Sequence, residues 1–309
     1  MNIFASTMEQ IAFLMGIMAI GYILSKLNLV PKNSHNVLSK LENYVFMPAL
    51  VLSTFINNFT VEKLSQAGKL ILISFIVLLV VIPFTIVVSK LTTKDKYIQK
   101  IYIYGLSFSN FAFMGNAIME NMFPDIFLDY LIFTLPLWIL IYLWGVPKLL
   151  IGDENGGKSI KDTLKTLVNP MFVAMLIGMV IGITGIKLPN FVMKAVGSMG
   201  SCMSPVAMLL SGMIISEISL KQTFTNVRTY VISVVRLIII PLIFIGLAKF
   251  IPFEKSVYIC TLCTLAMPLG LNTVVIPSAY DKDTSDAAGL ALVSHILACI
   301  TIPVIFSVI

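Results

Sequence analysis

The sequence predicts an all-α integral membrane protein of ten transmembrane helices, arranged as a 5+5 inverted repeat with broken crossover helices 4 and 9. Three observations support this prediction. Hydrophobic residues make up 58% of the 309 positions, charged residues only 12%, and the mean hydropathy is +0.97, whereas soluble domains carry about 25% charged residues. Long apolar runs alternate with short polar breaks, and landmark residues recur at one offset in the two halves of the chain.

Ten apolar runs are long enough to be membrane spans, since a helix needs about 20 mostly apolar residues to cross roughly 30 Å of hydrocarbon. The start of the chain carries Glu9 and lacks both a basic region and a small-residue cleavage site. We therefore expect the first run to be a retained helix and not a signal peptide. The predicted spans are 8–26, 36–57, 66–90, 97–122, 127–150, 166–186, 191–216, 227–250, 255–280 and 286–309.

The two halves of the chain carry matching landmarks at an offset of 155–158 residues. This register predicts a first five-helix repeat over 1–150, a cytoplasmic linker over 151–165 and a second five-helix repeat over 166–309. Because five is odd, the second repeat enters the membrane from the opposite side, so the repeat is inverted. The matched pairs are Pro31 and Pro189, Pro48 and Pro205, Pro83 and Pro241, Lys100 and Lys255, Gly115 and Gly270, and Pro147 and Pro303.

The basic residues predict the orientation. If both termini lie outside, the inner loops and helix ends carry about twice as many Lys and Arg residues as the outer ones, as the positive-inside rule requires. We expect a multi-pass protein of the plasma or inner membrane, with the lipid bilayer as its partner.

Several other classes of protein are disfavoured. The net charge of +6 comes from basic residues scattered singly in short loops, so no nucleic-acid partner is expected. Cys260 and Cys263 form a C-x-x-C pair inside an apolar run without a second pair or a nearby His, so no metal site is predicted. No H-E-x-x-H, phosphate-binding loop or G-x-S-x-G motif is present, so we expect neither an enzyme nor a cofactor.

Helices 4 and 9 carry the predicted site. In inverted-repeat transporters, substrates bind near the bilayer midplane where matching helices are broken. Pro268 removes a backbone donor from the ninth span, and Gly115 and Gly270 ease non-helical dihedrals at repeat-matched positions. The alternative is that Gly and Pro are common in membrane helices and that Asn residues bridge neighbouring helices. The predicted substrate-binding residues are Asn110, Phe113, Gly115, Asn116, Pro268, Gly270, Asn272 and Arg236.

These motifs resemble the auxin efflux carrier family, most closely its bacterial malonate and malate permeases. Asn110-Phe111-Ala112-Phe113-Met114-Gly115 is similar to the family's N-x-x-F-M-G, and Met267-Pro268-Leu269-Gly270-Leu271-Asn272 resembles its second motif. The resemblance implies crossed fourth and ninth helices, elevator-type motion against helices 1, 2, 6 and 7, and a homodimer. Ala117 stands where the family usually has a proline, so the fourth helix lacks the proline that interrupts the ninth.

Charged and polar residues inside the spans complete the predicted site, because such groups are costly in lipid. Arg236 could pair with a substrate carboxylate, or its side chain could extend to the headgroups or pair with another helix. Glu42, Ser109 and His295 are the candidates for a coupling H⁺ or Na⁺. Glu42 could instead partner Arg236 or stabilise a helix N-terminus, and His295 could bridge helices.

The predicted function is secondary transport of a small organic anion, either a carboxylate or an auxin-like acid. The alternatives are a membrane sensor that binds a ligand without moving it and a gated anion channel. The sequence leaves open the identity of the anion, the coupling ion and the direction of transport.

Overall fold

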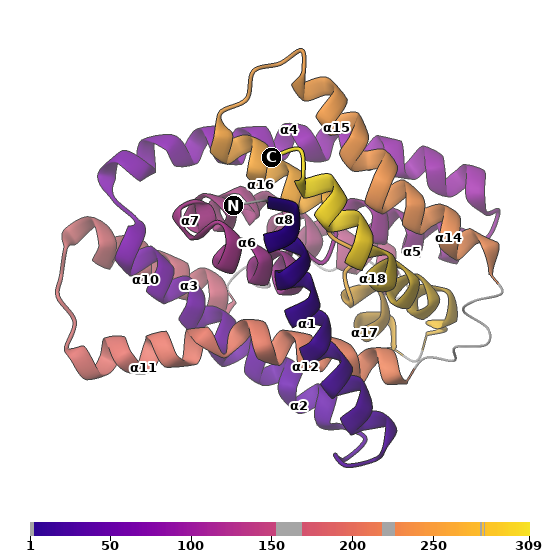
Figure 1. Ribbon diagram of the computed structural model, residues 1–309, viewed down its shortest axis with the longest axis horizontal. Helices are drawn as coiled ribbons and strands as arrows, with labels where there is room; N and C mark the ends of the chain where they lie inside the picture. Colours follow the sequence, from indigo (N-terminus) through magenta and orange to yellow (C-terminus); the bar gives the residue numbers. More distant parts are fainter. Residues whose placement is uncertain (1–2, 153–168, 218–225, 279, 281) are drawn as a thin grey trace.

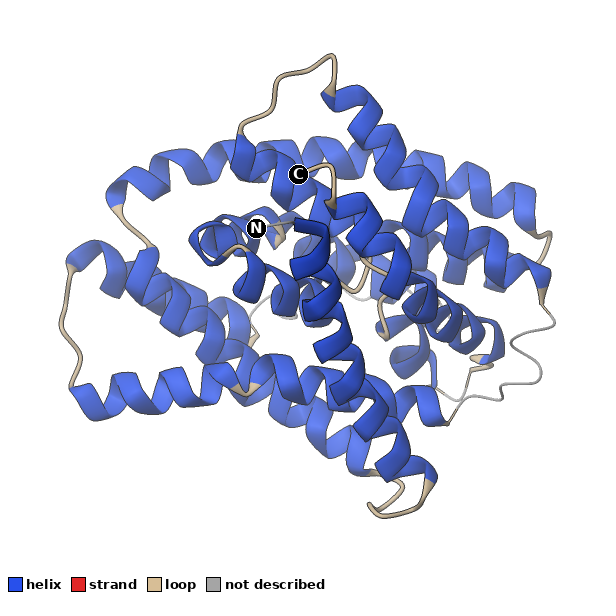
Figure 2. Cartoon of the chain, viewed as in Figure 1, coloured by secondary structure: helices blue, strands red, loops and turns tan. Residues whose placement is uncertain are grey.

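The computed structural model describes residues 3–152, 169–217, 226–278, 280 and 282–309. Every regular element in this part of the chain is helical (Figures 1 and 2), which confirms the predicted all-α class. The elements of the first half are α1 (Ile3–Lys26), α2 (Ser34–Leu41), η1 (Glu42–Phe46), α3 (Met47–Asn58), α4 (Val61–Thr92), α5 (Lys96–Ser107), η2 (Phe111–Gly115), α6 (Asn116–Met122), α7 (Pro124–Phe133), α8 (Leu135–Leu140) and η3 (Ile141–Ile151), where η marks a π-helical segment.

The regular elements of the second half that the structure describes are also helical. Apart from Ile151 and Gly152, the predicted linker lies outside the described residues. The elements are α10 (Pro170–Thr184), α11 (Asn190–Ser201), α12 (Met203–Ser216), α14 (Val227–Val234), η4 (Val235–Ile239), α15 (Ile240–Ala248), α16 (Lys255–Ala266), α17 (Asn272–Ser278) and α18 (Ser285–Phe306).

Local sequence signals explain where several helices begin and end. The side chains of Thr60, Asp95 and Asn169 accept backbone N–H groups at the starts of α4, α5 and α10, which satisfies donors that the first turn leaves without partners. Gly185 follows α10 with a φ of 66°, a left-handed conformation that glycine adopts without steric cost.

The helices have the length and surface of a multi-pass membrane protein. Large apolar side chains such as Phe13 on α1, Leu72 on α4 and Leu176 on α10 are exposed, as expected for lipid-facing surfaces. Two shorter apolar helices, Pro170–Thr184 and Lys255–Ala266, accompany six stretches that are long and apolar enough to cross a bilayer. These six are Ile3–Lys26, Val61–Thr92, Pro124–Ile151, Asn190–Ser216, Val227–Ala248 and Ser285–Phe306.

Helices from the two halves pack directly against one another. In the first half, α1 packs along α12 and α3 packs along α10 and α11, which are elements of the second half (Figure 1). At the crossing of α1 and α12, a Cβ added to Gly21 would lie 2.1 Å from the Leu209 carbonyl oxygen, and one added to Gly212 would lie 1.9 Å from the Met18 carbonyl oxygen. Glycine therefore allows the two backbones to touch, a common device in membrane helices.

Candidate functional site

Two interrupted helices meet at their breaks. In the fourth predicted span, α5 ends at Ser107 and the helix resumes with η2 at Phe111. In the ninth, α16 ends at Ala266 and the helix resumes with α17 at Asn272. The Asn110 N–H donates to the Pro268 carbonyl oxygen at 2.8 Å, and an isolated antiparallel bridge joins Ser109 to Leu269. The unwound backbone of each break thus satisfies part of the other, as burial in a membrane protein requires.

The fourth span unwinds without the family's proline. Ala117 is helical and fully buried within α6, and the break lies upstream of it, at 108–110. Gly270 allows this contact, because a Cβ there would lie 3.1 Å from the Ser109 carbonyl oxygen. The missing proline therefore does not prevent the interruption.

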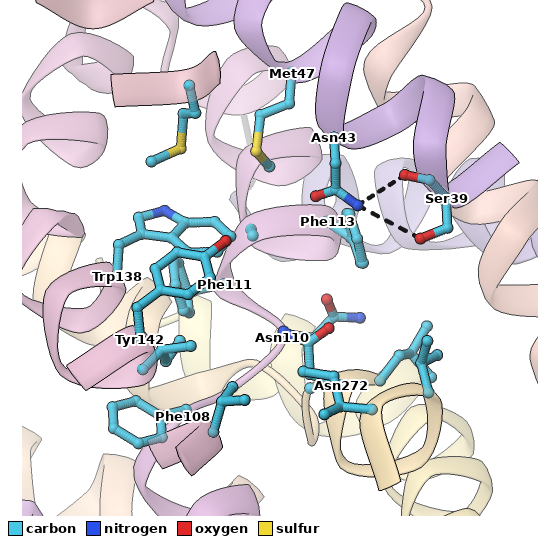
Figure 3. Close-up of a pocket in the computed structure, with 18 of the residues that line it drawn as sticks. Ser39, Asn43, Met47, Phe108, Asn110, Phe111, Phe113, Trp138, Tyr142 and Asn272 are labelled. Atoms are coloured by element: carbon cyan, nitrogen blue, oxygen red, sulfur yellow. Dashed lines mark hydrogen bonds between the residues drawn. The ribbon is translucent and has the colours of Figure 1, made fainter. Parts of the chain in front are cut away.

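A cavity of about 370 Å³ lies beside the crossed breaks (Figure 3), within the roughly 300–1,000 Å³ typical of small-molecule sites. Its polar groups come mainly from Ser39, Asn43, Asn110, Asn169 and Asn272, and its wall is largely aromatic. No Asp, Glu, Lys or Arg is among the described residues that line it. The aromatic lining residues are Tyr44, Tyr104, Phe108, Phe111, Phe113, Trp138 and Tyr142.

Asn110 is held by His295, which lies on α18. His295 is buried, its Nδ1 lies 2.7 Å from the Ala291 carbonyl oxygen, and its Nε2 lies 3.0 Å from Asn110 Nδ2. A carbonyl oxygen can only accept, so in a neutral ring Nδ1 carries the hydrogen and Nε2 accepts. Asn110 Nδ2 is then the donor to the ring, and this hydrogen bond sets the orientation of the side-chain amide beside the cavity.

The predicted substrate-binding residues divide into two groups. Asn110, Phe113, Gly270 and Asn272 line the cavity. The Asn272 side chain lies beside the Tyr104 hydroxyl, which makes no hydrogen bond of ordinary geometry within the described structure.

The other four predicted residues are near the breaks but do not line this cavity: Gly115, Asn116, Pro268 and Arg236. Gly115 packs against Tyr130, whose hydroxyl donates to the Phe111 carbonyl oxygen at 2.9 Å. Asn116 is buried and lines a separate small void. Pro268 contributes its carbonyl oxygen to the contact with Asn110.

Arg236 binds backbone instead of facing the cavity. It is 1% exposed, and its guanidinium donates to three carbonyl oxygens: Nε to Met267 at 3.0 Å, Nη1 to Leu106 at 2.7 Å and Nη2 to Thr264 at 2.6 Å. The alternative that its side chain extends to the headgroups is wrong, because the breaks of both helices hold it in the protein interior.

The candidates for ion coupling lie in different surroundings. Ser109 lines the cavity, and its hydroxyl donates to the Thr264 carbonyl oxygen at 2.7 Å. Glu42 begins the π-helical segment η1 and is completely buried, and neither carboxylate oxygen has a hydrogen-bond partner among the described residues. The hypothesis that Glu42 partners Arg236 is therefore wrong, because the arginine donates to backbone carbonyls instead.

Several lining residues were not predicted. Asn43 Nδ2 donates to the Ser39 carbonyl oxygen at 2.7 Å and lies 3.4 Å from Ser39 Oγ (Figure 3). Trp138 and Tyr142 stack, with ring centroids 5.9 Å apart. Polar residues inside an apolar run could have pointed to Asn43, but an aromatic pair at helical spacing has no signal that separates a cavity wall from a packed core.

No group of three or more His, Cys, Asp or Glu side chains that could hold a metal ion occurs within the described ranges. All four cysteines are free, and Cys260 and Cys263 are buried.

Comparison with known proteins supports the membrane assignment. A family model described as "Membrane transport protein" matches residues 6–306. The chain is also 22% identical over 287 residues to a protein of Methanocaldococcus jannaschii named "Uncharacterized transporter MJ1031", and the alignment covers 89% of this chain and 90% of that protein.

Proposed function

Because the chain belongs to the membrane transport protein family and its motifs resemble those of auxin efflux carriers, we propose that it is a secondary transporter of a small organic anion. The observation that carries this proposal is the cavity of about 370 Å³ at the meeting point of two interrupted helices. Broken helix pairs of this kind form substrate sites in inverted-repeat transporters.

The polar lining suits a carboxylate bound by neutral donors. The helix that starts with η2 at Phe111 and continues through α6 to Met122 begins at the cavity, and helix N-termini carry partial positive charge. Asn110 and Asn272 add side-chain amides. The aromatic wall would contact the body of the acid, so both aliphatic carboxylates and auxin-like aromatic acids are candidate substrates.

The proposed mechanism is alternating access of the elevator type, in a 5+5 inverted repeat of ten spans. Its support is the packing of α1 on α12 and of α3 on α10 and α11, which groups the predicted spans 1, 2, 6 and 7 as a scaffold. The crossed breaks would then move with the remaining helices. Homodimer formation, a cell-membrane location and external termini are parts of the same proposal.

Uptake and counterflow of radiolabelled malonate, malate and an aromatic monocarboxylate into proteoliposomes test the proposal. We expect Asn110→Ala and Asn272→Ala to reduce flux strongly. Asn121→Ala is the matched control, because Asn121 is exposed and its amide donates to Ala117 within α6. Flux that is unchanged in both cavity variants would refute the site.

The same preparation separates the alternatives. A sensor would bind one of the acids and show no flux. A gated anion channel would carry currents well above carrier turnover and would show no counterflow. Counterflow that saturates with substrate supports the carrier.

A further inference from the structure

The Arg236 guanidinium lies at the C-terminal ends of both helices that precede the breaks. Leu106 is in the last turn of α5, Thr264 is in the last turn of α16, and Met267 directly follows α16. Arg236 donates one hydrogen bond to the carbonyl oxygen of each, at 2.6–3.0 Å. One side chain therefore joins the two interrupted helices.

These carbonyl groups need donors from outside their own helices, and the Thr264 carbonyl oxygen accepts from the Ser109 hydroxyl as well as from Arg236. The last carbonyl groups of a helix have no intrahelical donor, and aligned peptide dipoles give this end a partial negative charge. Two such ends converge here in the protein interior, where water cannot compensate them. A cation at this point satisfies the hydrogen-bonding groups and the electrostatics of both helices together.

The arginine is specifically placed for this contact. Arg236 lies in the π-helical segment η4, Val235–Ile239, and single π-helical turns inside α-helices are frequent at functional sites. A buried charge in a membrane protein is costly and needs a compensating role. Within the described structure its guanidinium donates to carbonyl oxygens, and no salt bridge involves it.

In transporters with broken helices, unwound carbonyls and half-helix C-termini are the groups that coordinate a coupling Na⁺. We propose that Arg236 is a resident cation that occupies this position permanently, so that transport by this protein does not require Na⁺. This inference rests on the proposed transport function for its coupling consequence, and on the three hydrogen bonds alone for the role of the guanidinium.

The first arm of the test uses the wild-type protein. Counterflow of a transported acid is measured in proteoliposomes with Na⁺ salts and again with choline replacing Na⁺ on both sides. Equal counterflow in the two conditions is expected. A requirement for Na⁺ would overturn the proposal.

The second arm uses Arg236→Ala with chemical rescue. Hydrogen bonds to charged groups are among the stronger ones in proteins, so losing three of them should lower counterflow by about tenfold or more. Millimolar guanidinium should raise the melting temperature of Arg236→Ala in detergent and restore part of its flux. Arg228→Ala is the control, because this arginine lies near the start of the same helix and outside the breaks; guanidinium should leave it unchanged.

Arg236→Lys keeps the test decisive if the alanine variant does not fold. A lysine retains the positive charge but not the planar guanidinium with its several N–H donors. We therefore expect Arg236→Lys to have intermediate stability and intermediate flux, and the flux should remain independent of Na⁺. An Arg236→Ala protein with wild-type stability and flux would overturn the proposal, as would a folded Arg236→Ala protein that guanidinium does not stabilise. If no tested acid is transported by the wild type, the proposed function fails, whereas guanidinium stabilisation of Arg236→Ala still decides the role of the resident cation.

Discussion

The pair formed by Asn110 and His295 can be tested by a double-mutant cycle. The His295 ring is 1% exposed and receives its Nε2 hydrogen bond from Asn110 at 3.0 Å. Asn110→Ala removes that donor and leaves a buried acceptor unsatisfied. His295→Ala removes the acceptor from the other side. The double variant removes both groups, so part of the cost of each single change should disappear.

The magnitude follows from the burial of the pair. Leaving one buried hydrogen-bonding group without its partner costs about 1–3 kcal/mol. A change of 1 kcal/mol moves the melting temperature by roughly 2–4 °C in chains of 150–250 residues. We therefore expect each single variant to melt about 2–12 °C below the wild type, with a coupling energy of about 0.5–3 kcal/mol in the cycle.

Thermal unfolding in detergent measures the cycle without knowledge of the substrate. His295→Gln should recover part of the stability, because a Gln side-chain oxygen can accept from the Asn110 amide. Asn121→Ala should stay within about 0.5 kcal/mol of the wild type, as is usual for exposed positions. In the transport assay, His295→Gln should change the apparent KM more than the maximal rate, since the histidine orients Asn110 and does not itself line the cavity.

Additive effects of Asn110→Ala and His295→Ala would refute this reasoning, because they would mean that the two side chains contribute independently. A His295→Gln variant as damaged as His295→Ala would show that the accepting nitrogen is not the important feature of the histidine.

Two further predictions concern close backbone approaches. Gly212→Ala would place its Cβ 1.9 Å from the Met18 carbonyl oxygen, so the variant should lose about 1–3 kcal/mol of stability by overpacking. Thermal unfolding measures this loss, with Gly16→Ala as the control because nothing lies within 4 Å of a Cβ there. Equal melting temperatures of the two variants would contradict the prediction. Gly115→Ala would place its Cβ 2.2 Å from the Tyr130 hydroxyl, so we expect lower stability and lower flux. Adding Tyr130→Phe removes that oxygen and should restore part of both. A double variant with no recovery would exclude the hydroxyl as the cause.

The break in the ninth span was predictable from the sequence, whereas the position of the break in the fourth was not. Pro268 acts locally, because its ring removes a donor and clashes with the preceding turn wherever it stands in a helix. The fourth span has no such residue near its break. Its interruption at 108–110 depends on Asn110 and Ser109 pairing with Pro268 and Leu269, more than 150 residues away in the chain.

Arg236 illustrates the same limit. Its cost in lipid marked it as a functional candidate from composition alone, but the sequence could not distinguish a substrate carboxylate from a carbonyl partner. Its hydrogen-bond partners lie on other elements, where α5 and α16 end.

The sequence by itself therefore determined that the chain lies in lipid, that it is helical and that the ninth span breaks at Pro268, because hydropathy and proline chemistry act over short stretches of chain. The repeat register of Gly115 and Gly270 pointed only to the matching region of the fourth span. Only the tertiary structure decided which side chains line the cavity, that His295 orients Asn110 and that Arg236 donates hydrogen bonds to backbone carbonyl oxygens. Those contacts join α5, α16, η4 and α18, and packing between distant helices follows from no local pattern.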